Sequence, residues 1–495
     1  MSSLWKRKSL DSLLSETGDE THALKKTLGP LNLIALGIGA IIGAGLFVRT
    51  ASAAAYSAGP SVTLAFIVAA IGCAFAGLCY AEFASMIPVA GSAYTYSYAT
   101  LGEGVAWVIG WDLVLEYGIG AATVAIAWSE YLNKLLSFLP GGHQIPYQWC
   151  HSPFESLRDA AGQVTATGIM NLPALFIVLV MTLLLIRGTK ESAFVNGIIV
   201  ITKVAIVILI IAFGWGFIDP ANHTPYIPEA TTVVDKQGIS HNFGGIMGIL
   251  GAAGVVFFAF IGFDAVSTAA QESVNPKRDM PIGILGSLAI CTVLYILFAH
   301  VLTGVASVDD FRNSGHEASV AYAIDHHMPG YGWLAKLVTI AILAGFSSVI
   351  LVLLMGQSRV FFSMSRDGLV PKAFSEVHPK FRTPYKSNLL FFVFVGAFAA
   401  FVPGDIVGDM TSIGTLFAFV LVCVGVWVLR VRNPDAPRQF KTPLVPLVPI
   451  LGIIVNAAMI FALGWPNWLR LAAWLAIGIV IYFAYSQFHS KLRDR

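Results

Sequence analysis

The feature that most constrains the fold is an apolar run over about residues 31–56 whose centre is rich in glycine. The run is long enough to cross a bilayer, which takes about 20 apolar residues. Four glycines lie within Gly37–Gly45, and each costs a helix interior roughly 1 kcal/mol relative to alanine. In lipid, an interrupted helix persists only where its freed backbone groups face protein or a cavity. Small residues four apart also permit close helix packing, and Gly39 and Gly43 fit that spacing. Gly37 and Gly45, however, add more glycine than close packing needs. We therefore expect a broken first helix that forms a site.

Composition sets the class of protein. The chain is 56% hydrophobic and 12% charged, against about 25% charged for an ordinary soluble chain. This balance predicts an all-α polytopic membrane protein. The expected transmembrane helices number twelve and lie near residues 31–56, 61–86, 102–134, 169–187, 193–214, 244–270, 281–305, 332–362, 388–403, 407–430, 445–463 and 468–487. No linker divides these runs, so we expect one membrane domain over 29–487, preceded by an arm over 1–28 and followed by a tail over 488–495.

Basic residues are distributed unevenly between the two predicted sides. Of the 30 Lys and Arg residues, 22 fall in the arm, the tail and the loops on the side of the N-terminus, and six fall in the opposite loops. Arg49 and Lys203 lie within spans. Because positive charge accumulates on the cytoplasmic side, both termini are predicted to be cytoplasmic. A polar segment precedes the first span, so no cleavable signal peptide is predicted.

A second glycine-rich interruption supports the broken-helix interpretation. Gly244–Gly254 leads directly into Val255–Asp264 within the sixth span, which enters the membrane from the face opposite to the first. Glycine-interrupted spans at corresponding positions of two halves are typical of transporters with inverted repeats and a midplane site. The expected repeats cover about 31–214 and 244–430, and the two additional C-terminal helices cover about 445–487.

Interrupted helices offer backbone groups to a ligand. The last carbonyls before a break carry partial negative charge, and the first N–H groups after it carry partial positive charge. An amino acid zwitterion presents a carboxylate and an ammonium group close together, so it can use both without a charged side chain. The predicted substrate-binding residues on the two breaks are Ile41, Ile42, Gly43, Ala44, Gly45, Phe258, Ala259 and Ile261.

At this point the chain resembles the amino acid–polyamine–organocation (APC) superfamily, in particular its cationic amino acid transporter-like group. The resemblance runs from about residue 28 to 441. Each of its motifs is weak alone, but together and in this order they are specific: Gly39–Gly45, Tyr80–Phe83, Pro88–Tyr94, Gly110–Asp112, Phe258–Asp264, Asn275-Pro276 and Met364–Leu369. The resemblance implies a five-plus-five inverted-repeat fold with two additional C-terminal helices, discontinuous first and sixth helices, and alternating access. Position 44 is often a hydroxyl residue in relatives and is alanine here, which leaves a substrate carboxylate more dependent on backbone N–H groups.

Lys203 is the sharpest single signal within the predicted membrane region. A lysine at the bilayer centre costs at least about 2.5–3.5 kcal/mol on insertion scales. Snorkelling is the ordinary alternative, but the span continues about ten residues in either direction, beyond comfortable reach of an interface. In relatives, a lysine on this helix stands where sodium-coupled members of the fold bind sodium. The resemblance therefore implies that the proton is the coupling ion.

Other acidic and aromatic residues have weaker signals. Glu116 has two interpretations. It is either a functional carboxylate, in the substrate pocket or on a proton path, or a structural carboxylate whose hydrogen bonds come from neighbouring helices. Asp264 is expected to cap the inner half of the sixth helix, and Glu82 and Glu272 are expected to be gate or loop partners. Phe346 is either core packing or, since the resemblance places this helix beside the substrate side chain, a pocket wall that favours small neutral substrates such as alanine.

These observations predict a secondary transporter, not an enzyme, that carries small neutral L-amino acids by proton symport, with an exchanger of cationic amino acids or polyamines as the alternative. Neither G-x-S-x-G nor H-E-x-x-H occurs, and no repeated pore segment argues for a channel. The five cysteines show no metal-ligand spacing and are expected to be free thiols. We expect the protein to lie among the lipids of a bacterial inner membrane. We expect no cofactor, metal site or nucleic-acid partner, and the sequence identifies no accessory subunit.

Overall fold

The computed structural model describes residues 4–8, 28–87, 92–158, 163–188, 193–235, 238, 240–270, 273–313 and 319–492. The helices that form the bundle are α2 (Pro30–Ile41), η1 (Gly45–Arg49), α3 (Thr50–Ala53), η2 (Ala54–Ala58), η3 (Gly59–Ser61), α4 (Val62–Met86), α5 (Ser92–Thr100), α6 (Glu103–Leu113), η4 (Val114–Ile119), α7 (Gly120–Ser137), α8 (Leu172–Arg187), α9 (Ala193–Gly214), α10 (Gly245–Val256), η8 (Phe257–Phe260), α11 (Ala265–Thr268), α12 (Pro276–Val305), α15 (Gly332–Arg366), α16 (Tyr385–Phe401), α17 (Gly404–Arg432), α18 (Leu447–Ala462), α19 (Trp465–Ile481) and η11 (Tyr482–Ser486). The connecting elements are η5 (Tyr147–Trp149), η6 (Trp215–Phe217), η7 (Pro220–His223), α13 (Val308–Asn313), α14 (Ser319–His327), η10 (Lys372–Ser375), α20 (Gln487–His489), and strands β1 (Ser156–Arg158), β2 (Val164–Thr167), β3 (Thr231–Val234) and β4 (Ser240–Phe243).

The chain is an integral membrane protein by the length and composition of its helices. Within the described residues, eight helical stretches are long and apolar enough to cross a membrane, and α2, α8, α16 and α18 are shorter apolar helices. Every predicted span falls on one or more of these helices. Large apolar side chains on the outer surface of the bundle, such as Phe176 on α8 and Val393 on α16, are exposed. Such a surface suits lipid rather than water.

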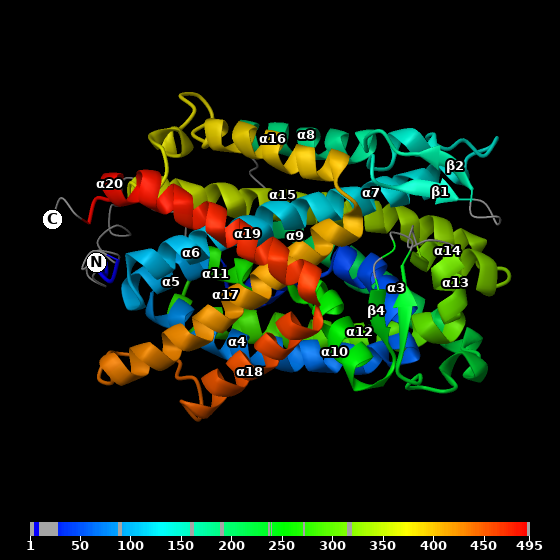
Figure 1. Ribbon diagram of the computed structural model, residues 1–495, viewed down its shortest axis with the longest axis horizontal. Coiled ribbons are helices and arrows are strands. Elements are labelled where there is room, and N and C mark those ends of the chain that lie inside the picture. The colour runs from blue at the N-terminus through cyan, green and yellow to red at the C-terminus, as the bar shows by residue number, and fades with distance from the viewer. Residues whose placement is uncertain are drawn as a thin grey trace.

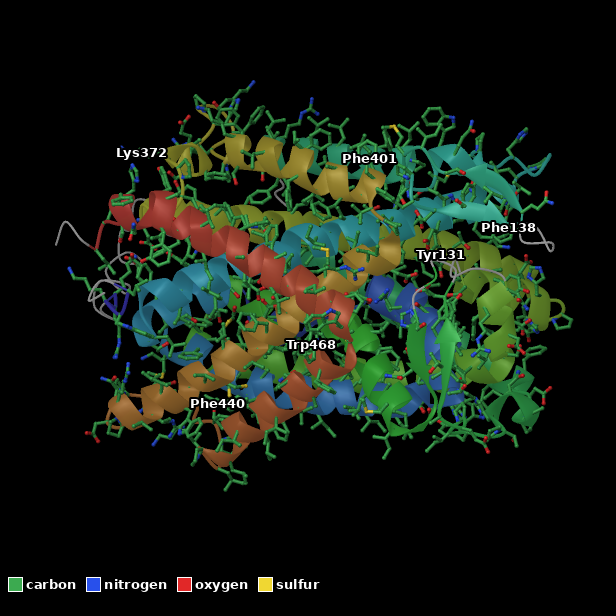
Figure 2. The ribbon with its side chains drawn as sticks, in the orientation of Figure 1. Tyr131, Phe138, Lys372, Phe401, Phe440 and Trp468 are labelled. Carbon is green, nitrogen blue, oxygen red and sulfur yellow. The ribbon has the colours of Figure 1, made fainter. Side chains whose placement is uncertain are left out.

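The bundle has two distinct ends, which Figure 1 places at left and right. Both chain termini lie at one end, here called the terminal face, and the β-hairpins with α13 and α14 lie at the other, here called the hairpin face (Figure 1). Helices α8 and α16 pack side by side along one edge of the bundle (Figure 1). Lys372 lies at the terminal face and Phe138 at the hairpin face (Figure 2).

The packing brings the two interrupted helices to the centre. Helix α12 packs against both α2 and α4, and η1 contacts η8. Helix α15 contacts α2, α7 and α9. Tyr295 of α12 and Phe260 of η8 are fully buried in this core. The two breaks, at residues 42–44 and 257–262, are therefore surrounded by protein, as an interrupted helix in a membrane requires.

The structure differs from the all-α expectation in the connections. Strands β1 and β2 form one antiparallel hairpin, and β3 and β4 form another, with Thr231 opposite Phe243. The link between the second and third predicted spans contains a helix, α5, which the pattern of aromatic and small residues did not indicate. Most of the expected N-terminal arm, residues 88–91 of one family motif, and Glu272 lie outside the described residues.

Candidate functional site at the two helix breaks

The first helix is interrupted where its glycines predicted. Helix α2 ends at Ile41, and Ile42 is extended, with φ −71° and ψ 105°. Helical structure resumes in η1 at Gly45, with Ala44 preceding it. The N–H groups in the first turn of a helix have no intrahelical acceptor. The backbone from Gly43 to Gly45 therefore presents donors at the break.

The sixth predicted span is also interrupted, at the end of its glycine-rich helix. Helix α10 tightens into the 3₁₀ turn η8, after which Ile261 is extended with ψ 136°. Gly262 has φ +108°, a conformation that side chains disfavour. A Cβ at Gly262 would lie 3.0 Å from the carbonyl carbon of Ala40, and a Cβ at Gly45 would collide with the backbone of Ala259. The two breaks are thus in direct backbone contact, which only glycine permits at these positions.

Tyr295 joins the two breaks, and sequence analysis missed it. Its hydroxyl lies 3.0 Å from the carbonyl oxygen of Ile41 and 2.9 Å from that of Ala259. A hydroxyl has a single hydrogen to donate, so the two carbonyls compete for it and one retains accepting capacity. Two helix-end carbonyls that converge beside free N–H groups can bind an ammonium and a carboxylate on one carbon. A lone tyrosine in an apolar span gave no sequence signal of this role.

Lys203 reaches the same region from α9. Its side chain is 3% exposed, and Nζ donates a 2.7 Å hydrogen bond to the carbonyl oxygen of Gly39 in the last turn of α2. A Cβ at Gly345 of α15 would lie 3.1 Å from the Lys203 Cε. The side chain therefore points into the bundle toward the first break instead of snorkelling to an interface. A cation at this position is also attracted to the partial negative charge at the C-terminal end of the helix.

A cluster of buried acids lies beside the sixth-helix break. Glu116 is 0% exposed and lies on η4, a π-helical turn of the kind often found at functional sites. Its carboxyl group faces that of Asp264, and within the described residues neither Glu116 oxygen meets a hydrogen-bond donor. Two carboxylates are acceptors only, so a proton is needed for them to bond to each other. A proton shared between Glu116 and Asp264 would let the two groups form a hydrogen bond.

The expected capping role of Asp264 is wrong. The residue precedes α11, as expected, but its side chain makes no cap hydrogen bond. It accepts instead from the Tyr117 hydroxyl at 2.5 Å and from the Ser92 hydroxyl at 3.3 Å. Hydroxyl groups on η4 and α5, rather than the N–H groups of α11, therefore supply the hydrogen-bond donors to this carboxylate.

Phe346 lies in an aromatic cluster against the outer half of the first helix. Its ring centroid is 6.2 Å from that of Phe47 and 5.6 Å from that of Tyr131. Phe298 packs edge-on to Phe47 at 5.7 Å. Tyr131, labelled in Figure 2, also donates to the Phe47 carbonyl oxygen at 3.2 Å. Phe47 lies two residues after Gly45, so the cluster forms an apolar wall beside the predicted carboxylate site.

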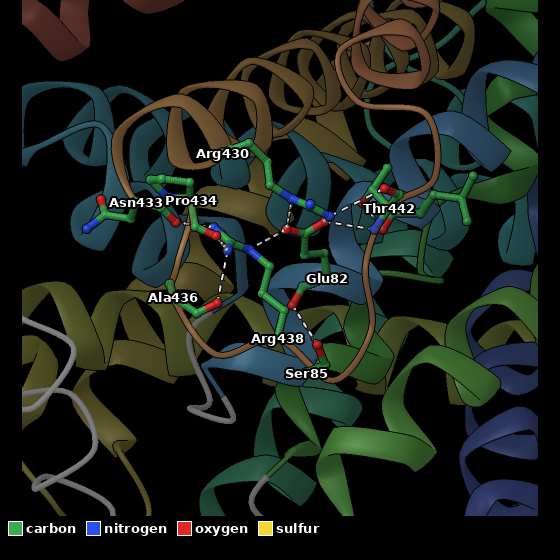
Figure 3. Close-up of polar contacts among 9 residues, drawn as sticks. Glu82, Ser85, Arg430, Asn433, Pro434, Ala436, Arg438 and Thr442 are labelled. Atoms are coloured by element: carbon green, nitrogen blue, oxygen red, sulfur yellow. Dashed lines mark hydrogen bonds and ion pairs between the residues drawn. The ribbon is translucent and has the colours of Figure 1, made fainter.

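Glu82 lies away from the breaks and ties a loop to the bundle. Its carboxylate accepts from Arg430 at 2.8 and 3.0 Å, from Arg438 at 3.0 Å and from the Thr442 N–H at 2.8 Å (Figure 3). These contacts hold the segment between α17 and α18 against α4. The structure thus places Glu82 as a loop partner, in agreement with the sequence. His300 packs between Trp215 and His223 near the hairpin face.

All five cysteines lie within the described residues, where they are buried and form no disulfide. Among the described residues, no group of three or more His, Cys, Asp or Glu side chains is arranged to hold a metal ion. The polar groups near the breaks are backbone amides, hydroxyls, two carboxyl groups and one lysine. This set suits a small organic zwitterion and protons.

Comparison with known proteins agrees with this chemistry. Residues 28–484 match the family described as amino acid permease. The chain is 45% identical to the branched-chain amino acid permease BcaP of Bacillus subtilis (strain 168), over 99% of each chain. It is 39% identical to the methylthioribose transporter of the same organism, over 99% of this chain and 100% of that protein. It is 35% identical to the vacuolar cationic amino acid transporter 4 of Arabidopsis thaliana, over 88% of this chain and 68% of that protein.

Proposed function

Because the chain belongs to the amino acid permease family of the APC superfamily and is a transporter rather than an enzyme, we propose that it carries neutral L-amino acids across a bacterial cytoplasmic membrane by alternating access, with the proton as the coupling ion. One observation carries the proposal. The carbonyls of Ile41 and Ala259 converge on the Tyr295 hydroxyl, beside the free N–H groups that follow the first break. The substrate ammonium would replace the Tyr295 hydrogen on one carbonyl, and the carboxylate would bind the N–H groups of residues 43–45.

The aromatic cluster supports a neutral aliphatic substrate. Phe47 and Phe346 provide apolar surface next to the break, and Phe346 is 1% exposed. Such a wall fits small to branched aliphatic side chains, and the relative of highest identity given above is named for branched-chain amino acids. Exchange of cationic amino acids remains the second candidate, supported by the plant relatives. A cationic side chain would have to displace the phenyl ring or reach the Glu116 carboxyl.

Lys203 is proposed as the proton-coupling residue. When protonated, its ammonium group holds the C-terminal end of α2 through the Gly39 carbonyl. Loss of the proton removes the positive charge that is attracted to the partial negative charge at the C-terminal end of α2. The contact between Lys203 and the Gly39 carbonyl is then weaker. Proton release would thereby free the half-helix that contributes to the substrate site. Coupling then follows from one contact between α9 and α2.

Glu116 and Asp264 provide a second proposed position for a proton. A proton shared by the two carboxyl groups removes one buried negative charge beside the sixth break. Since burial of two unpaired carboxylates is costly, the pair favours the singly protonated state. Sharing this proton with Asp264 is the role that we propose for Glu116 in the pocket or proton path.

The topology proposal places the terminal face in the cytoplasm. The support is the excess of Lys and Arg predicted on that side. Lys372 lies at the terminal face (Figure 2), as this orientation requires. Single cysteines introduced at Ser240 and at Leu492 should differ in labelling of intact cells by an impermeant maleimide. Only the Ser240 cysteine should react, and the reverse pattern would invert the topology.

The substrate proposal is tested by ligand-dependent thermal stability of the purified protein. Ligand that binds the folded state alone stabilises it by about 2.7 kcal/mol at 100 times its Kd. We expect L-valine, L-leucine, L-isoleucine or L-alanine to raise the unfolding temperature, and L-arginine and methylthioribose to leave it unchanged. Stabilisation by methylthioribose alone would replace an amino acid substrate with a sugar, and stabilisation by arginine would favour the cationic candidate.

A further inference from the structure

An apolar groove lies on the outer surface of the bundle near the terminal face. Its volume is about 270 Å³, and it is bounded by α6, α17, the junction of α19 with η11, and the N-terminal residues Leu4 and Trp5. Ile479 and Phe483 in its lining are exposed on the outer surface of the bundle. The groove therefore opens toward the surrounding lipid. None of its lining residues belongs to the helix breaks or to the proton positions proposed above.

The groove offers a ligand almost no polar partner. Trp107 and Tyr482 are the buried aromatic residues of its lining, and their polar atoms are already bonded within the protein. The Trp107 indole donates to the carbonyl oxygen of Gly478 at 2.8 Å, and the Tyr482 hydroxyl donates to Glu103 at 2.9 Å. Apart from the Trp5 indole, the other lining side chains are aliphatic or phenyl groups. A hydrocarbon chain fits this lining, whereas a zwitterionic amino acid does not.

Residues 4–8 form one wall of the groove and are tied to the bundle. The Gly104 N–H donates to the Leu4 carbonyl oxygen at 2.9 Å, and two further backbone hydrogen bonds join the segment to α5 and to the start of α6. The Lys8 ammonium group pairs with Asp367, directly after α15, at 2.8 Å. This wall therefore has a defined position between the groove and the end of α15.

Positive charge gathers beside this wall. Lys6 and Arg7 directly follow Trp5, and all three side chains are exposed. The Lys6 ammonium group donates to a backbone carbonyl at 3.3 Å, and within the described part of the chain no carboxylate pairs with Lys6 or Arg7. Partial burial, and then the charge of Arg432 at the end of α17, lower the pKa of Arg7. An exposed indole beside basic side chains is typical of the level of the lipid headgroups.

We propose that this groove binds an acyl chain of an anionic phospholipid, whose headgroup lies on Lys6, Arg7 and Arg432. The apolar lining accepts hydrocarbon, and the positive charge beside it favours an anionic headgroup over a zwitterionic one. The chain contacts residues 4–5 and the headgroup contacts residues 6–7, so the bound lipid holds the N-terminal segment against α5 and α6. It thereby supports the contact between Lys8 and the end of α15. This site does not depend on which substrate the protein carries.

The test is lipid retention by the full-length protein in native mass spectrometry, after incubation with phosphatidylglycerol and phosphatidylcholine that have the same acyl chains. Wild type should retain one phosphatidylglycerol in preference to phosphatidylcholine. The double variant Lys6→Gln/Arg7→Gln should bind this lipid about 25-fold more weakly, because each cation near a membrane surface strengthens binding about fivefold. The matched control is Lys372→Gln/Lys380→Gln, which removes two exposed cations from the link between α15 and α16, outside the groove lining.

A second variant, Val108→Trp, tests the groove without altering a charge. Its indole would fill the space between α6 and α17, so phosphatidylglycerol should bind more weakly although every cation remains. Because Lys6 and Arg7 are exposed, the double variant tests the site even if Val108→Trp fails to fold.

Three results would overturn the proposal. The first is equal retention of the two lipids by wild type, and the second is retention of phosphatidylglycerol that neither variant weakens. The third is a dimer mass that Val108→Trp abolishes, which would make a second copy of the chain the occupant of the groove. Weaker binding of both lipids in Val108→Trp, with no effect of the double variant, would likewise overturn recognition of an anionic headgroup.

Discussion

Substitution of Gly45 by alanine should disable the site because the two breaks touch at this residue. A Cβ at Gly45 would lie 2.5 Å from the backbone nitrogen of Ala259, and ordinary contact begins at 3.4 Å. One break must therefore retreat by about 1 Å, and overpacking of this kind costs about 1–3 kcal/mol. The helix propensity of alanine returns about 1 kcal/mol. The net loss of folding stability is modest, about 0–2 kcal/mol, but a displacement of about 1 Å at a binding site lowers activity by about 10²-fold.

Gly43→Ala is the matched control. A Cβ at Gly43 would lie 3.3 Å from a methyl group of Val349, and a side chain can adjust by that tenth of an ångström. We expect Gly43→Ala to retain most of its uptake and Gly45→Ala to lose nearly all of it. The assay is uptake of labelled L-valine into proteoliposomes, with thermal unfolding of both variants as the check on folding. Equal uptake by the two variants would refute the argument that backbone contact at Gly45 builds the site.

Four further perturbations test separate parts of the structure. Lys203→Ala should abolish pH-gradient-driven accumulation but preserve folding, and undiminished pH dependence would remove Lys203 from coupling. Phe346→Ser should let L-arginine compete with labelled L-alanine uptake if the ring is a pocket wall, whereas a core role should mainly lower expression, since truncation of a core Phe costs about 3–5 kcal/mol. Glu82→Gln should destabilise the protein by about 3 kcal/mol in denaturation, because two arginines lose a buried partner; unchanged stability would contradict this. His241 has a raised pKa, so its stabilising pair with Asp235 is complete below about pH 6.5 and is lost as pH rises through the raised value. The difference in melting temperature between wild type and His241→Asn should shrink over that rise, and a difference independent of pH would refute the pairing.

The interrupted helices could be predicted because lipid makes glycine informative. An interrupted helix in a membrane needs protein around its freed backbone groups, so Gly37–Gly45 indicated a break at the centre of the bundle. Gly244–Gly254 itself lies almost wholly in the continuous helix α10, and the second break follows it at residues 257–262. Lys203 was informative for a similar reason, since its insertion cost requires a compensating partner. The partner itself, the carbonyl of Gly39, could not be read from a sequence separation of 164 residues.

Residues whose roles depend on distant partners were missed. Tyr295 is one of 15 tyrosines, and only folding brings its hydroxyl to the carbonyls of two other helices. Arg49 was recognised as a charge within a span, but its aspartate partners on α17 lie more than 350 residues away. Asp264 was assigned to the wrong partner because local capping rules do not include the Tyr117 hydroxyl. Local patterns thus located the breaks, and tertiary packing determined which side chains serve them.

The central claim is that the pH gradient alone drives uptake through a site built on the two breaks. The most direct measurement is accumulation of labelled L-leucine by proteoliposomes with an acidic exterior and no internal amino acid. One proton per substrate across a gradient of one pH unit supplies about 1.4 kcal/mol, which permits about tenfold accumulation. The account predicts accumulation above equilibrium that a protonophore abolishes. Uptake that never exceeds equilibrium, or that requires internal counter-substrate, would contradict it.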